Sequence, residues 1–303
     1  MQRKNKTAKL TFPPNTHLAE NREDAPWSSD RRHEECGLFG IYGHPDSATH
    51  TALGLNALQH RGQEATGMVV YDGEQFHSHR ALGLVGDNFN SPDVMDRLEG
   101  TMAIGHVRYS TSGDTALRNV QPLFADFKFG GLAVAHNGNL TNAYAVRKRL
   151  VDRGCLFQST SDTEAIIHLI AISEYGHVVD RITDALSQIE GAYSLVAMTQ
   201  KKLIGVRDPH GVRPLILGRL GDSYILASET CALDIIGAEF IRDVEPGEIV
   251  IIDDKGVRSV KPFAKKSERF CIFEYIYFAR PDSIIESRNG YERRKQIGAE
   301  LAR

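Results

Sequence analysis

The sequence has no long apolar run, no excess of one charge and no closely spaced pair of cysteines. No stretch of its 303 residues approaches about 18 consecutive apolar residues, so we expect no membrane-spanning helix. The 36 Lys and Arg nearly balance the 39 Asp and Glu, and the net charge of −3 argues against a dedicated nucleic-acid or membrane-surface binder. The four cysteines, at positions 36, 155, 231 and 271, form no C-x-x-C pair. This usage favours reduced thiols and a cytoplasmic location over a disulfide framework.

Composition places the chain among ordinary globular proteins and divides it into three segments. A hydrophobic content of 41%, with 27 Gly and 11 Pro, suits neither a collagen nor a low-complexity chain. Residues 1–35 contain no apolar run that would suit a secretory signal, and we expect a disordered leader that is removed. Residues 36–265 have globular character. Residues 266–303 end in a charged amphipathic pattern, which we interpret as a hinge and the first helix of a second, truncated domain.

The order of the expected elements indicates an α+β fold. Strands come first, helices follow and strands return, without regular βαβ alternation. Two antiparallel sheets packed face to face and covered by helices would account for this order. Ser161 and Glu164 have the spacing of a capping box at the start of one helix. The expected strands cover 37–43, 68–71, 101–109, 131–136, 192–198, 203–207, 215–218, 224–228 and 249–253, and the expected helices cover 49–59, 142–153, 162–175, 180–189 and 291–303.

Cys36 is the first candidate for chemistry. It stands between the acidic end of the leader and an apolar strand pattern. A buried cysteine often serves packing alone. Cleavage between Glu35 and Cys36, however, would place a free α-amine with a pKa of about 7.7–8.0 beside a thiol with a pKa of about 8.5. One residue would then supply both nucleophile and general base, as in N-terminal threonine hydrolases.

Asn137 and Gly138 follow an expected strand and have two interpretations. Asn-Gly at a strand end commonly forms a turn in which the glycine takes a positive φ. An Asn amide beside a Gly backbone N–H is also a competent oxyanion hole, which an acyl-transfer nucleophile requires. Together with Cys36, the pair predicts such a site.

Three charged residues complete the candidate site. Arg108 ends an apolar strand and could hold a carboxylate through two hydrogen bonds, although a surface salt bridge would also explain it. Asp162, in the first turn of a helix, either complements the helix dipole or holds a substrate ammonium. Arg61 ends the first helix, where a cation is unremarkable. A thiol, an oxyanion hole and holders for the α-carboxylate and α-ammonium together favour attack on the side-chain amide of glutamine.

The segments that carry these residues resemble the class II glutamine amidotransferases, and among them the family of glutamine phosphoribosylpyrophosphate amidotransferases. The resemblance runs from residue 36 to the end of the chain. The resemblance rests on seven segments: CGLFGIYG at 36–43, ALQHRGQEATG at 57–67, GHVRYST at 105–111, AHNGNLTN at 135–142, SDTE at 161–164, RDPHGVRPL at 207–215 and FEYIYFARPDS at 273–283.

The resemblance implies a fold, a reaction and a role for each residue. The fold is the four-layer αββα sandwich of the N-terminal-nucleophile hydrolases, followed by the start of a phosphoribosyltransferase-type domain. Cys36 becomes the nucleophile freed by removal of a propeptide, and Asn137 and Gly138 become the oxyanion hole. Arg61, Arg108 and Asp162 become substrate-binding residues. Glutamine would be hydrolysed through a thioester, and ammonia would displace pyrophosphate from phosphoribosylpyrophosphate in the first step of purine synthesis.

Cofactors and partners follow from the same resemblance. We expect no cofactor within this chain, but Mg²⁺ and in some members one [4Fe–4S] cluster in the longer protein, whose phosphoribosyltransferase half is missing here. Cys271 is similar to a cluster-ligand position, although a cluster needs four thiolates and an inert buried thiol is the alternative. The family implies a homodimer or homotetramer, and neither nucleic acid nor a membrane as partner.

Three alternatives remain open at this point. The chain could be the glutaminase half of another class II amidotransferase, such as glutamate synthase. It could be a catalytically silent module of the same fold. It could also be a conventional Cys–His hydrolase that uses His106 or His136 as its base.

Overall fold

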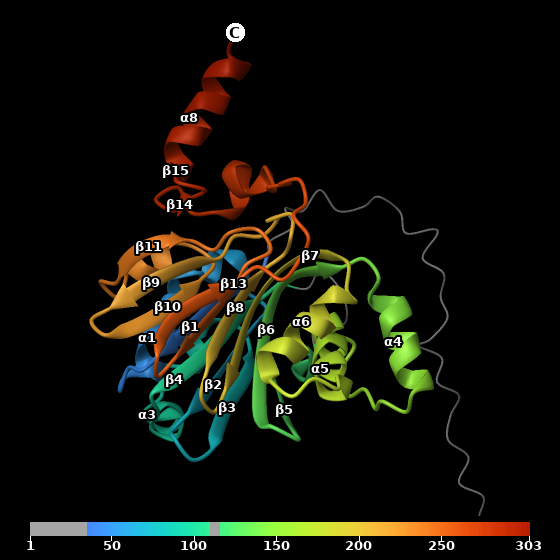
Figure 1. The fold of residues 1–303 in the computed structure, drawn as a ribbon. Coiled ribbons are helices and arrows are strands. Elements are labelled where there is room, and N and C mark those ends of the chain that lie inside the picture. The colour runs from blue at the N-terminus through green and yellow to red at the C-terminus, as the bar shows by residue number, and fades with distance from the viewer. Residues whose placement is uncertain (1–34, 110–115) are drawn as a thin grey trace, which may run out of the picture. The chain divides into compact units, whose positions relative to one another are not determined.

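Two antiparallel sheets form the centre of the structure, a computed structural model that describes residues 35–109 and 116–303 (Figure 1). One sheet has the strand order β11 (Glu239–Asp243), β9 (Ile216–Leu220), β10 (Ser223–Ala227), β1 (Gly37–Tyr42), β4 (Met102–Arg108), β2 (Ala65–Tyr71) and β3 (Phe76–Leu82). The other has the order β13 (Gly256–Val260), β12 (Ile249–Asp253), β8 (Leu203–Arg207), β7 (Gly191–Thr199), β6 (Gly130–Leu140) and β5 (Leu123–Phe127). The expected leader lies outside the described residues except for Glu35.

Helices cover the outer face of each sheet. The helices before β6 are α1 (Ser47–Ala57), α2 (Val85–Asn88) and α3 (Pro92–Met95), and those after it are α4 (Ala143–Asp152), α5 (Asp162–Ile172), α6 (Val178–Ser187), α7 (Cys231–Asp234) and α8 (Gly290–Leu301). Helices α1 and α7 pack on the β1 sheet, whereas α4, α5 and α6 lie against the β6 sheet (Figure 1). None of the described helices is long and apolar enough to cross a membrane.

Three hydrophobic cores separate the four layers. Phe39 and Leu55 belong to the core between α1 and the first sheet. Leu38 and Val196 belong to the core between the two sheets. Ile166 belongs to the core between the second sheet and α4–α6. Because successive residues of a strand face opposite sides, Leu38 and Phe39 of β1 supply two different cores. The predicted αββα arrangement is confirmed.

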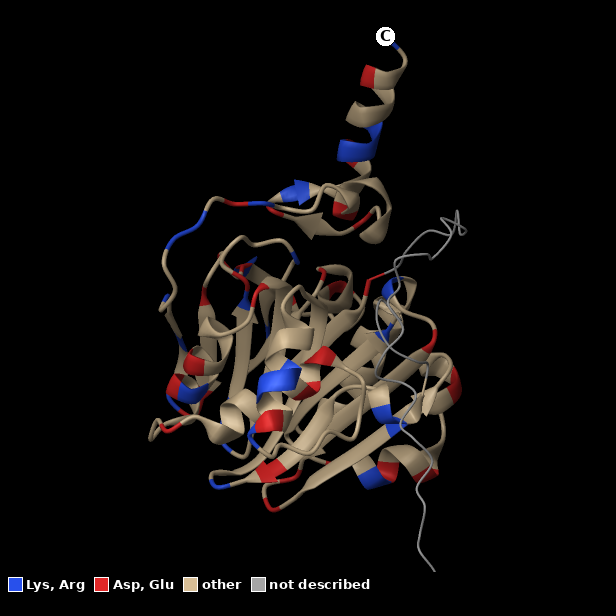
Figure 2. Ribbon diagram, turned by 90° about the vertical axis from the view of Figure 1, so that its right-hand side faces the viewer, with Lys and Arg blue, Asp and Glu red and all other residues tan. Residues whose placement is uncertain are grey.

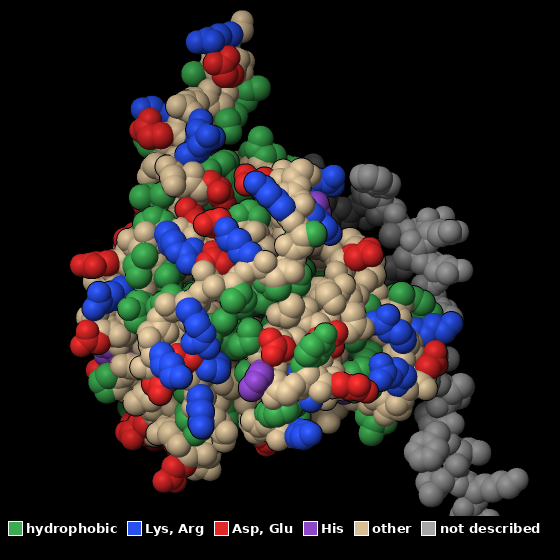
Figure 3. Space-filling view, viewed as in Figure 1, with side chains coloured by type: hydrophobic (Ala, Val, Ile, Leu, Met, Phe, Trp, Pro, Cys, Tyr) green, Lys and Arg blue, Asp and Glu red, His purple; other side chains and the backbone are tan. Residues whose placement is uncertain are grey.

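Charged side chains lie mainly on loops, helices and strand ends, and most of the strand ribbon carries none (Figure 2). On the face seen in Figure 3, positive and negative side chains are interspersed. This distribution agrees with the nearly balanced net charge of −3.

The capping box predicted at α5 is only half formed. The Ser161 hydroxyl accepts a hydrogen bond from the Thr163 amide at 3.3 Å, as a helix cap should. The Glu164 carboxylate accepts instead from the amides of Gln158 and Ser159, at 2.7 and 2.8 Å. These two amides lie in the loop before the helix, where they have no helical partner, so Glu164 stabilises the approach to α5 rather than the amide of Ser161.

The four edge strands β3, β5, β11 and β13 are not predicted by the sequence pattern. Elements near the centre of each sheet match their expected positions to within a few residues. The C-terminal segment contains a short π-helix, η5 (Glu274–Phe278), the two-stranded β14 (Ile284–Ile285) and β15 (Arg288–Asn289), and α8, which buries only Gly290. The boundary between residues 265 and 266 remains a prediction.

Candidate active site

Cys36 immediately precedes β1, a central strand, and is 9% exposed. Its thiol lies 3.5 Å from the Tyr109 carbonyl oxygen. Arg108, Gly138 and Asp162 line the same small cavity. Four of the predicted site residues therefore surround one space, although 102 residues separate Cys36 from Gly138.

Strand pairing explains how these residues meet. β1 and β4 run antiparallel with Gly37 opposite Val107, so the preceding Cys36 lies beside Arg108 at the other strand's end. Gly138 belongs to β6 in the facing sheet, and Asp162 is the first residue of α5, which packs on that sheet. The site thus lies where both sheets and one helix N-terminus converge.

The Cys36 thiol is protonated at neutral pH while residues precede it. Burial raises its pKa to about 11, and a backbone hydrogen bond with Tyr109 and the Arg108 and Arg61 cations lower it only in part. Because the nucleophile is the thiolate, this environment leaves Cys36 unreactive unless a base takes its proton.

The Asn137 side chain is fully buried, and neither its amide nitrogen nor its amide oxygen has a hydrogen-bond partner. Such groups are rare, because a buried unpaired amide costs about 1–3 kcal/mol. Next to it, Gly138 has a φ of +140°, and a Cβ there would lie 2.0 Å from the Ala192 carbonyl oxygen. The sheet admits only glycine here. The adjacent Asn137 amide is unpaired, but Asn137 is not among the residues that line the Cys36 cavity.

Asp162 is ionised at neutral pH. Burial raises its pKa, but His136 and the amides of Leu140 and Thr163 outweigh that effect, so the pKa lies below its ordinary value. The Leu140 amide donates to the carboxylate at 3.1 Å, and His136 Nδ1 lies 3.4 Å from it. A fixed negative charge therefore lines the cavity.

His106 is a poor candidate for a general base. Burial lowers its pKa to about 3, and its Nε2 lies 3.1 Å from the His136 carbonyl oxygen. The ring is fully buried and does not line the Cys36 cavity, whereas His136 does. His106 is thus a neutral core residue.

Arg61 lies next to Cys36 in a buried ion-pair network. Its Nε donates to the Cys36 carbonyl oxygen at 3.1 Å, one terminal nitrogen contacts Glu229 at 2.5 Å, and both terminal nitrogens bind Glu274 at 2.9 Å. The side chains of Arg61, Glu229 and Glu274 have 0% exposure. Burial opposes its charge, but the two carboxylates outweigh that and raise the Arg61 pKa. All three nitrogens of the guanidinium therefore bind protein groups.

Sequence reasoning did not predict Glu229, Glu274 or Arg213 as part of this neighbourhood. Glu229 also accepts hydrogen bonds from the Arg280 amide at 2.9 Å and the Ser283 hydroxyl at 2.7 Å. Arg213 binds Glu35, the residue before Cys36, at 2.6 Å. No local pattern signals these contacts, since Glu229 and Glu274 lie 168 and 213 residues from Arg61.

Comparison with known proteins agrees with this geometry. Residues 106–234 match a family model described as a glutamine amidotransferase domain. Amidophosphoribosyltransferase from Rhizobium etli is 55% identical over 285 residues, which cover 92% of this chain and 58% of that protein. The solved Bacillus subtilis structure of glutamine phosphoribosylpyrophosphate amidotransferase with ADP and GMP has a TM-score of 0.84 at 45% identity, over 88% of this chain and 58% of that one.

This chain carries a class II glutamine amidotransferase domain. A further solved structure, described as the allosteric regulatory enzyme of purine biosynthesis, has a TM-score of 0.85 at 46% identity. The chain shares the N-terminal-nucleophile hydrolase fold of these proteins and spans somewhat over half of their length.

Cys271 offers this glutamine amidotransferase domain one thiol and no complete cluster site. It lies in the C-terminal segment, where its amide donates to the Val212 carbonyl oxygen at 3.4 Å. Among the described residues, no group of metal-ligating side chains includes a cysteine. A [4Fe–4S] cluster needs four such ligands, so the described residues alone do not fit one.

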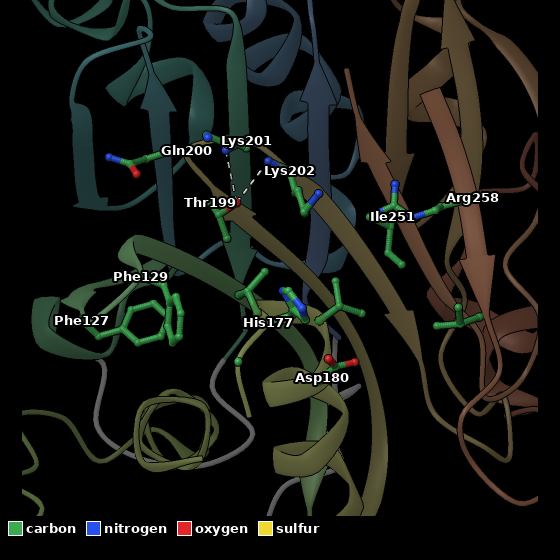
Figure 4. A pocket seen from close by; sticks show the side chains of 14 residues that line it. Phe127, Phe129, His177, Asp180, Thr199, Gln200, Lys201, Lys202, Ile251 and Arg258 are labelled. Carbon is green, nitrogen blue, oxygen red and sulfur yellow. Dashed lines mark hydrogen bonds between the residues drawn. The ribbon is translucent and has the colours of Figure 1, made fainter. Parts of the chain in front are cut away.

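A larger cavity, of about 720 Å³, lies elsewhere in the domain and shares no residue with the Cys36 cavity. Figure 4 shows Phe127 and Phe129 on one side and Arg258 on the other. Lys202 and Arg258 both bind the Asp253 carboxylate, at 2.6 and 2.7 Å. The positive charges of Lys202 and Arg258 are therefore partly neutralised within the protein, and no cysteine lines this cavity.

Proposed function

We propose that this chain is the glutaminase part of an amidophosphoribosyltransferase, with Cys36 as its N-terminal nucleophile. One observation carries the proposal. Cys36, Arg108, Gly138 and Asp162 line one cavity, and the unpaired amide of Asn137 precedes Gly138 on β6. This set matches what hydrolysis of a side-chain amide requires.

The first step forms a thioester. Once residues 1–35 are removed, the α-amine of Cys36 takes the thiol proton, and the sulfur attacks the amide carbon of glutamine. The developing oxyanion accepts hydrogen bonds from the side chain of Asn137 and the backbone N–H of Gly138. The tetrahedral intermediate then expels ammonia, which leaves with the proton that the α-amine returns.

Arg108 and Asp162 hold the substrate. The guanidinium of Arg108 binds the α-carboxylate of glutamine, and the ionised Asp162 binds its α-ammonium. Water then attacks the thioester carbon with the α-amine as base, the carbon–sulfur bond breaks, and glutamate and the free thiol are formed.

Ammonia passes to a part of the longer protein beyond this chain. There it displaces pyrophosphate from phosphoribosylpyrophosphate and gives 5-phosphoribosylamine, in the first step of de novo purine synthesis. Mg²⁺ belongs with the phosphoribosylpyrophosphate, and Cys271 would join an iron–sulfur cluster only together with cysteines outside the chain. We place the enzyme in the cytoplasm.

Arg61 acts as a positioning residue in this scheme. Its hydrogen bonds to Cys36, Glu229 and Glu274 fix the backbone of the nucleophile and leave the guanidinium no exposed surface for glutamine. It therefore orients the residue that reacts instead of contacting the substrate.

The test compares the full chain with a protein that begins at Cys36. We expect the shorter protein to release ammonia from glutamine and to be alkylated at Cys36 by a diazoketone analogue of glutamine, as intact-mass spectrometry would show. The full chain should do neither until residues 1–35 are lost. Equal glutaminase activity from a chain that retains residues 1–35 would disprove the mechanism, and a folded but unlabelled shorter protein would support a silent module.

A further inference from the structure

Three metal-ligating side chains gather at the turn between β1 and α1. The ligand atoms of His44, Asp46 and His50 all lie within 4.8 Å of one another. The rings of His44 and His50 pack edge to face, with centroids 4.3 Å apart. Among the described residues, this is the one group of three or more such side chains close enough to share an ion.

The backbone holds this turn in place. The amides of Gly43 and His44 donate to the Thr101 carbonyl oxygen at 2.8 and 3.0 Å. The Ser47 hydroxyl donates to the Gly100 carbonyl oxygen at 2.8 Å, and the His50 amide donates to the Asp46 carbonyl oxygen at 3.1 Å. The three ligand-bearing residues are therefore fixed relative to one another before any ion arrives.

Asp46 and His50 both offer metal-ligand atoms that remain available to an ion. Asp46 is the N-cap residue of α1, yet its carboxylate makes no capping hydrogen bond. An N-cap aspartate normally accepts one, so this carboxylate remains available. Nδ1 of His50 is buried and has no partner.

We propose that His44, Asp46 and His50 bind one divalent first-row transition-metal ion, with Zn²⁺ as the reference ion. Two imidazoles and one carboxylate suit such an ion better than Mg²⁺ or Ca²⁺, which prefer oxygen ligands alone. Water would complete the coordination, because Asp46 is exposed.

The site is separate from the proposed chemistry at Cys36. The six residues of β1 lie between Cys36 and the turn, a distance of roughly 20 Å at about 3.4 Å per residue. An ion there would clamp the far end of the central strand to α1 and to residues 100–101. We therefore expect it to affect stability rather than the glutaminase reaction.

The experiment titrates the purified full chain with Co²⁺ and then displaces it with Zn²⁺. We expect one equivalent of Co²⁺ with a d–d spectrum but no thiolate-to-metal charge-transfer band, which excludes the cysteines as ligands. His44→Ala and His50→Ala should each weaken binding by roughly tenfold or more. His77→Ala is the matched control, because His77 also lies beside a carboxylate, Asp72 at 2.7 Å, and should bind like the parent.

An amide resonance gives a second readout. The Asp46 amide donates to Nδ1 of His44 at 3.0 Å. Coordination of His44 through either ring nitrogen ends that hydrogen bond, so the Asp46 amide should shift on titration with diamagnetic Zn²⁺. Circular dichroism verifies that each variant is folded. Unchanged affinity in a folded His44→Ala/His50→Ala double variant, a thiolate band at one equivalent, or loss of binding in His77→Ala would overturn the proposal.

Discussion

Replacement of Glu274 by Gln tests the proposed role of Arg61 directly. The change is nearly isosteric and removes one of the two negative charges that neutralise a fully buried guanidinium. Removal of one partner from a buried ion pair costs about 3–5 kcal/mol, but Glu229 remains and Gln keeps one acceptor oxygen. We therefore expect the free energy of unfolding to fall by about 2 kcal/mol, the size of a hydrogen bond to a charged group.

The same change should slow the reaction without weakening glutamine binding. Arg61 donates to the Cys36 carbonyl oxygen, so a loosened guanidinium misplaces the nucleophile. If about 1.4 kcal/mol of the loss is expressed in the transition state, kcat falls about tenfold. KM for glutamine should stay within about twofold, because Arg61 does not contact the substrate in the proposed scheme and uniform binding is therefore unchanged.

Urea unfolding and steady-state ammonia release from the protein that begins at Cys36 measure both effects. Glu300→Gln is the matched control, since Glu300 is exposed and its ion pair is with Arg303, three residues away. That change should alter stability by less than about 0.5 kcal/mol and leave kcat unchanged. A Glu274→Gln variant with unchanged kcat and a raised KM would show that Arg61 contacts the substrate, and the positioning argument would be refuted.

Three further predictions concern the candidate site. Asn137→Ala should lower kcat for glutamine by about 10²–10³ at similar stability, because the side chain has no partner to lose; an unchanged kcat would exclude it from the oxyanion hole. Iodoacetamide should alkylate Cys36 of the full chain only slowly at pH 8, with a rate that rises about tenfold per pH unit up to a pKa of about 11, and a flat profile would contradict a buried thiol. The folded pKa of Asp162 lies below 3.8, so its ionised form stabilises the protein fully above that pH and the contribution is lost as the pH falls through the folded pKa. Asp162→Asn should accordingly be less stable than the parent at pH 7, and the difference should shrink in acid unfolding measured below about pH 4.

The central strands could be predicted from the sequence because both of their faces are buried. β1 and β4 read as apolar runs bounded by polar residues, and every residue of β4 is buried. The edge strands β3 and β13 contain exposed polar and charged residues at alternate or successive positions. Such strands form because a neighbouring strand, often far away along the chain, offers hydrogen bonds. The local sequence pattern does not contain that information.

The same distinction applies to the candidate site. Cys36, Asn137 and Gly138 occur in local strings whose chemistry can be recognised, and the structure brings Cys36 and Gly138 to one cavity. The carboxylates around Arg61 could not be predicted, because charged residues are normally exposed and nothing in their neighbouring sequence marks them as buried. Only the folded chain shows that Arg61 is enclosed by protein groups.

The origin of Glu274 limits how this protein can be divided for study. The ion-pair network that holds the Cys36 carbonyl group is completed by three groups that lie after residue 265, namely Glu274, the Arg280 amide and Ser283. A fragment that ends at residue 265 would lack the Glu274 carboxylate, so Glu229 would be left to neutralise Arg61. The Arg61 guanidinium would then be exposed to water. The segment after residue 265 is thus an internal brace of the strand that follows Cys36, and a force applied to this segment would reach Cys36 through a few short, charged contacts.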